Sequence, residues 1–408
     1  MLAVPGETST EEPSSSAAAA PPGLGTLVGR FDPEAIDVPS GRAMVRLAVR
    51  RLGAWDARIE AGRIDLVPAD EVKPDAVLSA DAETWEWIAE DIRGGMEAFR
   101  KGRLTVRQNL HLGVGFLAAT SGMREEARLR FDTFRTRAGR ISTVAAGEGP
   151  PVLCLHGLGG TKVSFLTTIA ALAEHYRVIA MDLPGFGESD KPLTGAYDAP
   201  FFARAADALL DELGVERAHL IGNSMGGRVA IEAGLLHPER TEKLALLSPA
   251  LAWLRDRRWR WLLSAPLPKL GLIQPTPRVI TDPIVRALVP GGRNGWSAAG
   301  VDEFLRSFLT PRGRVAFYEA ARNVYLDEPH GEEGLWTRLE TLAPESLFVW
   351  GRKDQLVPIG FMKHVERALP QARHVELDCG HVPQVEAPGP THQAILEFFA
   401  EGRSGKRK

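Results

Sequence analysis

Cysteine is scarce in this chain, and no sign of charge predominates. Only Cys154 and Cys379 occur among the 408 residues, and their spacing fits neither a disulfide framework nor a metal site. Two isolated thiols favour a reducing compartment, so we predict a cytoplasmic protein without a metal. The formal net charge of −3 gives no electrostatic basis for a nucleic-acid partner.

A long apolar run is also absent. No stretch reaches the length of about 20 residues that a membrane-spanning helix needs. Residues 1–22 are rich in Ser, Ala, Pro and Glu, and they lack the basic start and apolar core of a signal peptide. We therefore predict a disordered tail over residues 1–28 and a short basic tail over residues 401–408.

The chain does contain two successive patterns of strands and helices. Residues 29–122 hold short strand-like pieces and helical stretches, which predicts a small α+β domain. Residues 123–400 alternate short apolar runs with helical stretches, a pattern typical of a mostly parallel sheet flanked by helices. The predicted fold class is therefore α/β, preceded by the small domain.

The alternation is interrupted between about residues 250 and 339. This segment is rich in Pro, Trp and Arg and contains no clear strand. It falls between two strand candidates, so it would lie over the carboxyl ends of the strands, where open α/β sheets bind ligands. We predict a helical cap.

The most informative motif is Gly222-Asn223-Ser224-Met225-Gly226. It lies between an apolar, strand-like run and an amphipathic helix that ends before Pro238. A serine at the centre of G-x-S-x-G in this setting is typical of a nucleophile elbow. The glycines keep side chains away from the sharp turn that the serine occupies.

A serine hydroxyl needs a histidine base, which a carboxylate orients. His381 lies in a loop just after the last strand candidate, and Asp354 lies in the turn after the strand at residues 347–350. The order Ser, Asp, His is the one expected for this kind of elbow. His330 in the cap is the competing base, and Asp378 is the alternative acid.

Two backbone N–H groups would form an oxyanion hole. We assign one to Met225, which follows the serine, and the other to Leu158, in the glycine-rich loop at residues 156–160. His156 is interpreted as a structural residue of that loop. The charged loop at residues 182–190 is interpreted as a turn and not as a metal site, because proline and glycine dominate it.

Taken together, these motifs resemble the α/β-hydrolase fold family over roughly residues 131–400. The matching pieces occur in order at residues 156–160, 182–190, 222–226, 350–354 and 380–381. The resemblance implies that Ser224 is the nucleophile, His381 the base and then the acid, and Asp354 the orienting carboxylate. It implies no cofactor.

The branches of this family differ at the elbow and around the histidine. Dehalogenases and epoxide hydrolases resemble this chain but carry Asp where Ser224 stands. The Gly-Asn-Ser-Met-Gly-Gly elbow also resembles that of serine C–C bond hydrolases acting on meta-cleavage products. Those enzymes typically have an aromatic residue after the histidine, whereas Val382 follows His381 here.

The first domain resembles the sterol-carrier-protein-2-like fold over about residues 36–120. The resemblance rests on the glycine and apolar pattern at residues 62–64, 74–78, 84–90 and 101–106. It implies a cavity for a lipid ligand. Packing on the hydrolase domain or mediating assembly is an equally weighted alternative, because fold alone does not establish a ligand.

Arg and Trp alternate at residues 255–261 of the cap. We interpret this segment as an amphipathic helix whose arginines extend to water. Peripheral contact with an anionic membrane surface is the alternative. The leucine-rich residues that follow make the region apolar, which suits a hydrophobic ester substrate.

The sequence therefore predicts a serine hydrolase of the esterase or lipase type that acts through an acyl-enzyme. C–C bond hydrolysis of the meta-cleavage type is an alternative. A lipid-binding or scaffold protein with an inactive hydrolase domain is a hypothesis of a different class.

Overall fold

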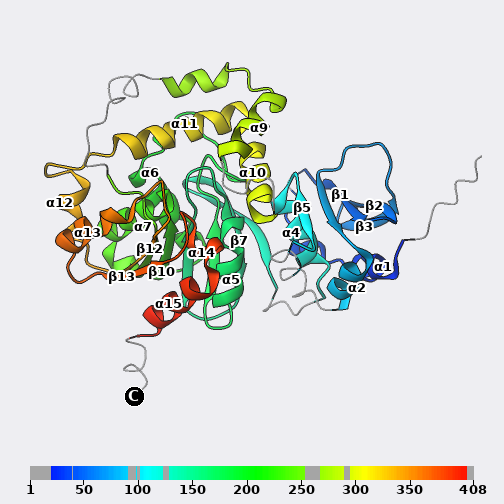
Figure 1. The fold of residues 1–408 in the computed structure, drawn as a ribbon, viewed down its shortest axis with the longest axis horizontal. Helices are drawn as coiled ribbons and strands as arrows, with labels where there is room; N and C mark the ends of the chain where they lie inside the picture. Colours follow the sequence, from blue (N-terminus) through cyan, green and yellow to red (C-terminus); the bar gives the residue numbers. More distant parts are fainter. Residues whose placement is uncertain are drawn as a thin grey trace, which may run out of the picture.

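The computed structural model describes residues 20–38, 40–90, 98, 102–122, 128–252, 267–288 and 295–401. Two β-sheets lie side by side, and a helical cap covers one edge of the larger sheet (Figure 1). The Arg/Trp segment at residues 255–261 and the basic residues 402–408 lie outside the described residues. None of the helices within those ranges combines the length and the apolar character needed to span a membrane.

The N-terminal domain is built on a five-stranded sheet in the order β3-β2-β1-β4-β5. All neighbouring strands are antiparallel except β1 and β4, which are parallel. The strands are β1 (Arg42–Val49), β2 (Gly53–Glu60), β3 (Arg63–Pro68), β4 (Ala76–Ala80) and β5 (Thr105–Arg107). The helices are α1 (Pro22–Gly29), η1 (Pro33–Ala35), α2 (Ala82–Glu90) and α4 (Leu110–Ala119).

Helix α1 corrects the predicted extent of the N-terminal tail. Residues 1–19 lie outside the described residues, but residues 22–28, predicted as part of a disordered tail, are helical. Leu24 and Leu27, three residues apart, are buried on one face, and α1 packs against α2. The N–H of Gly23 donates to Glu86 at 2.9 Å. The prediction failed because the polar composition of the first 22 residues was extended over this apolar pair.

Helix α4 connects the two halves of the molecule. All ten of its residues are buried. It contacts β1, β4 and β5 of its own sheet, and also β6 and the cap helix α10. A helix enclosed on all sides has no solvent face, which explains why its sequence is apolar without a helical period.

The larger sheet has eight strands in the order β13-β12-β11-β10-β8-β9-β7-β6. Its last two pairs, β6–β7 and β7–β9, are antiparallel, and the other pairs are parallel. The strands are β6 (Arg130–Thr136), β7 (Gly139–Ala146), β8 (Pro151–Leu155), β9 (Arg177–Met181), β10 (Ala218–Asn223), β11 (Thr241–Leu247), β12 (Glu345–Gly351) and β13 (Arg373–Leu377).

Helices cover both faces of this sheet. Val152 and Cys154 of β8 share a core with α5 and α15, whereas Leu153 and Leu155 share one with α6 and α7. Both sets are apolar because successive side chains of a strand point to opposite faces, and both faces are covered. These helices are η3 (Lys162–Phe165), α5 (Leu166–Leu172), α6 (Ala199–Glu212), α7 (Met225–Leu236), η4 (Pro238–Arg240), η6 (Ile359–Phe361), α13 (Met362–Ala368), α14 (Pro383–Glu386) and α15 (Pro388–Ala400).

The cap is inserted between β11 and β12. It comprises η5 (Leu267–Leu272), α9 (Arg278–Leu288), α10 (Gly295–Phe308), α11 (Pro311–Leu326) and α12 (Leu335–Leu339). Its described part contains helices and no strand. Because β11 and β12 are parallel neighbours, the insertion leaves the sheet at the carboxyl end of β11, the edge where the predicted site residues lie, and the chain re-enters β12 at the opposite edge.

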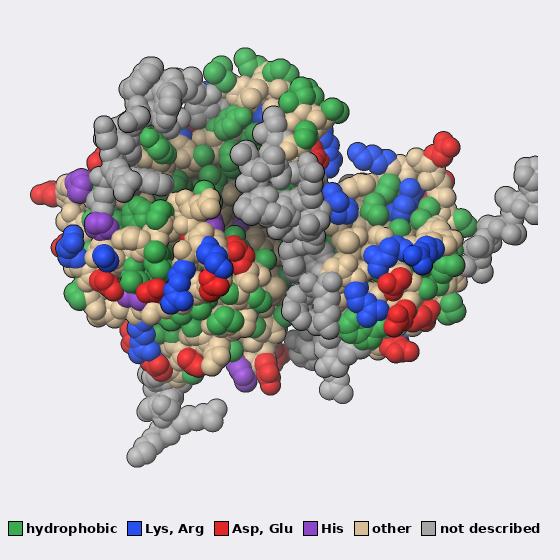
Figure 2. Space-filling model, viewed as in Figure 1, with side chains coloured by type: hydrophobic (Ala, Val, Ile, Leu, Met, Phe, Trp, Pro, Cys, Tyr) green, Lys and Arg blue, Asp and Glu red, His purple; other side chains and the backbone are tan. Residues whose placement is uncertain are grey.

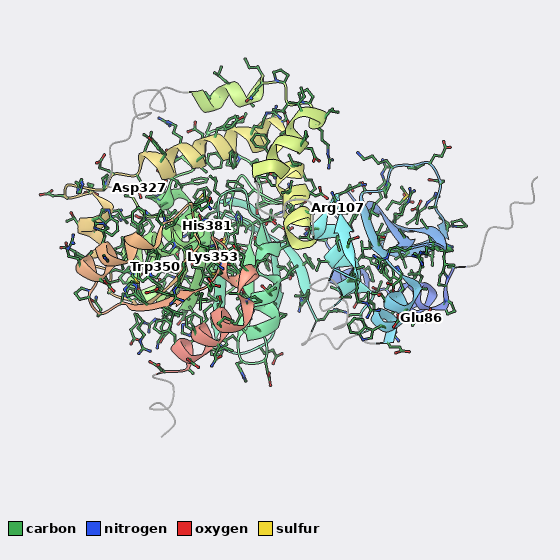
Figure 3. All side chains as sticks on the ribbon, in the orientation of Figure 1. Glu86, Arg107, Asp327, Trp350, Lys353 and His381 are labelled. Atoms are coloured by element: carbon green, nitrogen blue, oxygen red, sulfur yellow. The ribbon has the colours of Figure 1, made fainter. Side chains whose placement is uncertain are left out.

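Ion pairs join the cap to the N-terminal domain. Arg107, at the end of β5, donates to Asp302 of α10 at 2.6 Å (Figure 3). The N–H of Gln108 donates to the same carboxylate, and the N–H of Leu110 donates to Glu303. The side chain of Asp302 is only 2% exposed, so this contact is an internal one.

Candidate active site

Ser224 lies at a sharp turn between β10 and α7, with φ 55° and ψ −118°. Positive φ is uncommon for a residue with a side chain and indicates strain that the surroundings must hold. A Cβ atom on Gly222 would lie 2.3 Å from the carbonyl oxygen of Gly226, and one on Gly226 would lie 1.9 Å from that of Leu155. Both glycines are therefore required by backbone contacts, which is the local basis of the motif.

The two predicted oxyanion donors lie on either side of the serine. Helix α7 begins at Met225, so the N–H of that residue has no acceptor within the helix. Leu158 lies in the loop after β8 and directly follows Gly157. A Cβ atom on Gly157 would lie 3.2 Å from Cβ of Ser224, so this loop packs against the elbow.

The predicted base and acid form a hydrogen-bonded pair. Nδ1 of His381 lies 2.8 Å from Oδ2 of Asp354, whose side chain is fully buried. The other oxygen, Oδ1, accepts the N–H groups of Leu356 and Val357 at 2.8 and 2.9 Å. Burial raises the pKa of Asp354, but the hydrogen bonds from His381 and the two backbone groups outweigh it and leave the pKa below its usual range. The carboxylate therefore stays ionised at neutral pH.

Asn223 ties the histidine loop to the elbow. Its Nδ2 donates to the carbonyl oxygens of Leu247 and His381, both at 3.0 Å. Among the described residues, no hydrogen bond joins Oγ of Ser224 to the ring of His381. Catalytic hydrogen bonds are often long without substrate, and the side chains of Ser224 and His381 are both partly exposed.

Glu386 is a site residue that the sequence did not reveal. Its carboxylate accepts the N–H of Gly380 at 2.7 Å and the N–H of Val382 at 2.9 Å. These are the residues on either side of His381, so one carboxylate fixes the backbone of the base. An acid five residues after the histidine, at the end of a short helix, was the available signal.

The alternative acid and the other histidines either lie at the surface or have other partners. Asp378 is exposed and pairs with Lys353 at 2.9 Å. His330 is exposed in the segment between α11 and α12. The other downstream histidines are fixed elsewhere: His237 follows α7, His364 packs on Trp336, His374 accepts from Trp350, and His392 bonds Thr168.

The loops beneath the site are held by buried polar groups. His156 Nδ1 donates to the carbonyl oxygen of Gly157, and its Nε2 accepts the N–H of Leu183, so it links two loops as predicted. Lys162 and Asp182 form a buried ion pair with a distance of 2.6 Å. Burial raises the pKa of Asp182, but the Lys162 ammonium outweighs it and lowers the pKa to about 2. This pair, which the sequence did not indicate, fixes the start of the 182–190 loop.

Aromatic residues of the cap lie over the oxyanion loop. A Cβ atom on Gly159 would lie 2.8 Å from the ring of Phe304 and 3.4 Å from that of Phe317. These rings pack edge to face with centroids 5.3 Å apart, and Phe308 stacks on Phe304. The cap therefore presents apolar side chains to the loop beside the predicted nucleophile.

Buried charges anchor the far end of the cap to the elbow helix. Arg228 of α7 donates to Glu232 and to Asp327, which follows α11, both at 2.7 Å. Glu232 also accepts from Arg338 of α12 at 2.6 Å. A small cavity of about 60 Å³ adjoins Met225, Arg228 and Asp327. Across the described ranges, no cluster of His, Cys, Asp and Glu could hold a metal ion.

Comparison with known proteins agrees with this geometry. The family model of the alpha/beta hydrolase fold matches residues 150–388. The 2-hydroxy-6-oxo-6-phenylhexa-2,4-dienoate hydrolase of Burkholderia cepacia is 31% identical over 278 residues, covering 64% of this chain and 92% of that protein. The pimeloyl-[acyl-carrier protein] methyl ester esterase of Aeromonas hydrophila is 31% identical over 263 residues, covering 63% of this chain and 98% of that protein.

A solved structure gives the same result. The crystal structure of a membrane phospholipase A superposes with a TM-score of 0.52 at 26% identity, covering 67% of this chain and 87% of that one. The N-terminal domain lies outside the family match, so its resemblance to the sterol-carrier-protein-2-like fold stays a prediction. The family match spans more than half of the 408 residues, and the chain therefore belongs to the α/β-hydrolase fold family.

Proposed function

We propose that this protein hydrolyses carboxylic esters with a hydrophobic acyl or alcohol part. The observation that carries the proposal is the buried Asp354–His381 pair, which the Asn223 side chain ties to the strained Ser224 elbow. The aromatic cap over the oxyanion loop favours a hydrophobic substrate. An elbow serine, and not an aspartate, favours an acyl-enzyme over the dehalogenase and epoxide-hydrolase chemistries.

The reaction takes two steps. Oγ of Ser224 attacks the ester carbonyl carbon while its proton passes to His381, and the ionised Asp354 stabilises the imidazolium. The N–H groups of Met225 and Leu158 bind the oxyanion, each contributing about 10²–10³ in rate. His381 then protonates the leaving alcohol as the C–O bond breaks. A water molecule, deprotonated by His381, releases the acid and restores Ser224.

A fluorophosphonate probe tests the nucleophile directly. We expect the probe to label the wild type and not Ser224→Ala. Failure to label a folded wild type would refute the enzyme and favour the alternative of a scaffold protein with an inactive hydrolase domain. For the base, we expect His381→Ala to abolish ester turnover and His330→Ala to leave it unchanged, and the opposite result would overturn the assignment.

C–C bond hydrolysis is a second candidate, favoured by the 31% identity to the Burkholderia cepacia dienoate hydrolase. Such a substrate carries a carboxylate, which needs a cation when it is buried. In the described part of the cap, Arg306 and Arg322 pair with glutamates and Arg314 donates to backbone oxygens and Thr276, so Arg312 is the candidate partner for that carboxylate in α11. Turnover of aryl esters of graded length, compared with that of a 2-hydroxy-6-oxo-dienoate, separates the two candidates.

The N-terminal domain is proposed to bind a lipid, on the resemblance of its sequence alone. The five-stranded sheet supports this proposal, although α4 fills the space between that sheet and the cap. Mass spectrometry of organic extracts from the purified full chain tests it. A lipid retained in stoichiometric amounts is the expected result, and an empty protein that takes up no added fatty acid would leave only the packing role.

A further inference from the structure

The cap exposes an apolar surface on two elements other than α10, the helix that contacts the N-terminal domain. The surface, which we name the η5–α9 face, comprises Leu270, Leu272, Ile273, Val279 and Ile280. Ile273 is 79% exposed and Val279 is 86% exposed. Figure 2 shows hydrophobic side chains gathered along this edge of the molecule, at the top of the view. Contiguous exposure of large apolar side chains is unusual and marks an interaction surface.

Basic residues accompany the apolar ones. Lys269 and Arg278 are exposed on the same two elements, where Asp282, 3.8 Å from Arg278, is the one acidic residue. In the sequence of residues 267–288, which span η5 and α9, Lys and Arg outnumber Asp and Glu by three to one, whereas the whole chain has a net charge of −3. Positive charge is therefore concentrated on the part of the chain that carries the η5–α9 face.

A cavity adjoins this face. It has a volume of about 590 Å³ and is lined by Leu272 of the face together with Lys191, Arg306 and Arg312. Arg306 is neutralised by Glu188 and Glu303. Arg312 is exposed and has no carboxylate partner among the described residues, and Lys191 donates to two backbone oxygens, which leaves one of its three N–H groups. The cavity thus offers two cationic side chains to an anion.

We propose that the η5–α9 face docks on an anionic lipid surface and that the adjoining cavity receives a lipid phosphate. A protein that binds to one face of a membrane needs apolar side chains among exposed cations. The apolar side chains insert at the headgroup boundary, and the cations bind the lipid phosphates. A second copy of the chain fits less well, since a two-fold contact would bring Lys269 and Arg278 toward their own counterparts.

This inference goes beyond the proposed esterase activity and does not depend on it. The docking residues differ from the Arg/Trp segment that suggested membrane contact in the sequence, and none of them belongs to the site at Ser224. Docking through the cap would nevertheless bring the aromatic rings of Phe304 and Phe317 close to a source of hydrophobic esters.

Vesicle sedimentation of the full chain tests the proposal without measuring catalysis. We expect the wild type to bind vesicles of phosphatidylcholine mixed with phosphatidylglycerol, to bind less as salt is added, and to bind phosphatidylcholine alone weakly. Ile273→Asp/Val279→Asp should lower the partition coefficient about tenfold or more. Arg312→Gln should lower it about fivefold on anionic vesicles only. Leu52→Asp/Val72→Asp, at exposed apolar positions of the N-terminal domain, should bind like the wild type.

Several outcomes would overturn the proposal. One is that the wild type binds neither kind of vesicle. Another is that Ile273→Asp/Val279→Asp binds anionic vesicles as well as the wild type does. If the wild type formed a dimer without lipid and Ile273→Asp/Val279→Asp were a monomer, the η5–α9 face would be the contact with a second copy of the chain. If calorimetry showed that the wild type binds inorganic phosphate and that Arg312→Gln does not, the cavity would be a site for a soluble anion and not for a lipid. Fluorophosphonate labelling of each variant reports separately on the proposed function, so either proposal can fail alone.

Discussion

At the scale of single residues, backbone atoms around Ser224 leave no room for a side chain at the neighbouring glycines. Ser224 holds a positive φ, and the glycines around it face backbone oxygens at distances that no Cβ could tolerate. Gly157 is different, because a Cβ there would meet Ser224 itself at 3.2 Å, a contact that is tight but not forbidden. We therefore expect a substitution at Gly157 to displace Ser224, the proposed nucleophile, without destroying the fold.

We expect Gly157→Ala to reduce kcat about tenfold to a hundredfold, since a displacement well under 1 Å at a reacting group has effects of this order. Steady-state turnover of a p-nitrophenyl ester and the rate of fluorophosphonate labelling measure it. Gly389→Ala is the matched control, because nothing lies within 4 Å of its Cβ position. Equal rates for both variants would mean that the oxyanion loop does not constrain Ser224.

Glu386 is predicted to act as a positioning residue for His381. Removal of its carboxylate in Glu386→Ala frees two backbone N–H groups beside the base, so we expect kcat to fall about tenfold with little change in KM. Glu386→Gln keeps one acceptor oxygen and should recover part of the loss. Steady-state kinetics with one ester measure both, and Glu397→Ala on α15 serves as the exposed control. A change in KM alone would contradict the positioning role.

The residues that could be predicted from the sequence are those whose role follows from local position. Ser224, Asp354 and His381 each follow a strand, so the strand pattern was enough to place them, while their catalytic roles stay a proposal. Lys162 and Asp182 could not be paired in this way, because a buried lysine in an apolar stretch looks like a surface residue. The second hydrogen bond of Asn223 reaches a residue 158 positions away, a distance that no local pattern encodes.

At the scale of elements, apolar runs located the strands of both sheets, whereas the contacts of the helices remained hidden. Helix α4 has an apolar sequence without a helical period, because a helix buried on every side has no polar face. The cap was predicted as an insertion, but its attachment through α10 depends on Arg107 and Asp302, which lie 195 residues apart. A pair of this kind cannot be predicted from the local sequence of either segment, because the fold brings the two residues together.

The tether between β5 and α10 can be tested by Arg107→Ala. The change removes the two guanidinium N–H donors from the buried Asp302, so we expect the free energy of unfolding to fall by about 1–3 kcal/mol. Urea denaturation measures the loss, and hydrogen exchange should rise in α10. The control is Arg50→Ala, whose partner Asp81 is 43% exposed and whose loss should cost less than about 1 kcal/mol. Equal losses would show that the tether contributes nothing beyond a surface pair.

At the scale of the whole molecule, the N-terminal domain and the hydrolase domain meet around one buried histidine. His111 of α4 packs edge to face on Phe131 of β6, and its Nε2 donates to the carbonyl oxygen of Asp37 at 3.3 Å. Burial, with the nearby Lys162 ammonium, lowers the pKa of His111 to about 3. The N-terminal domain and the hydrolase domain are therefore packed together in a way that tolerates only the neutral imidazole.

This arrangement predicts that acid destabilises the protein before its carboxylates titrate. When the pKa of a histidine is lower in the folded protein than in the unfolded chain, the unfolded chain binds the proton first as the pH falls. The contribution of that histidine to the free energy of unfolding is therefore fully present above about pH 6.5 and is lost as the pH drops toward its pKa in the folded protein. His392, with a pKa lowered to about 4 by burial, acts in the same direction. Asp354 and Asp182 have lowered pKa values, and their contributions are lost only below about pH 4.

Urea denaturation at several pH values between 6.5 and 4.5 measures the effect, and His111→Gln isolates its main source. The glutamine keeps a donor for Asp37 but does not titrate, so the slope of unfolding free energy against pH should decrease by up to about 1.4 kcal/mol per pH unit. Burial raises the pKa of Asp37, which opposes the trend, but that group is present in both proteins. Equal slopes for the wild type and His111→Gln would show that His111 binds a proton equally well in the folded and unfolded chains. The contact between the domains would then not depend on a neutral imidazole.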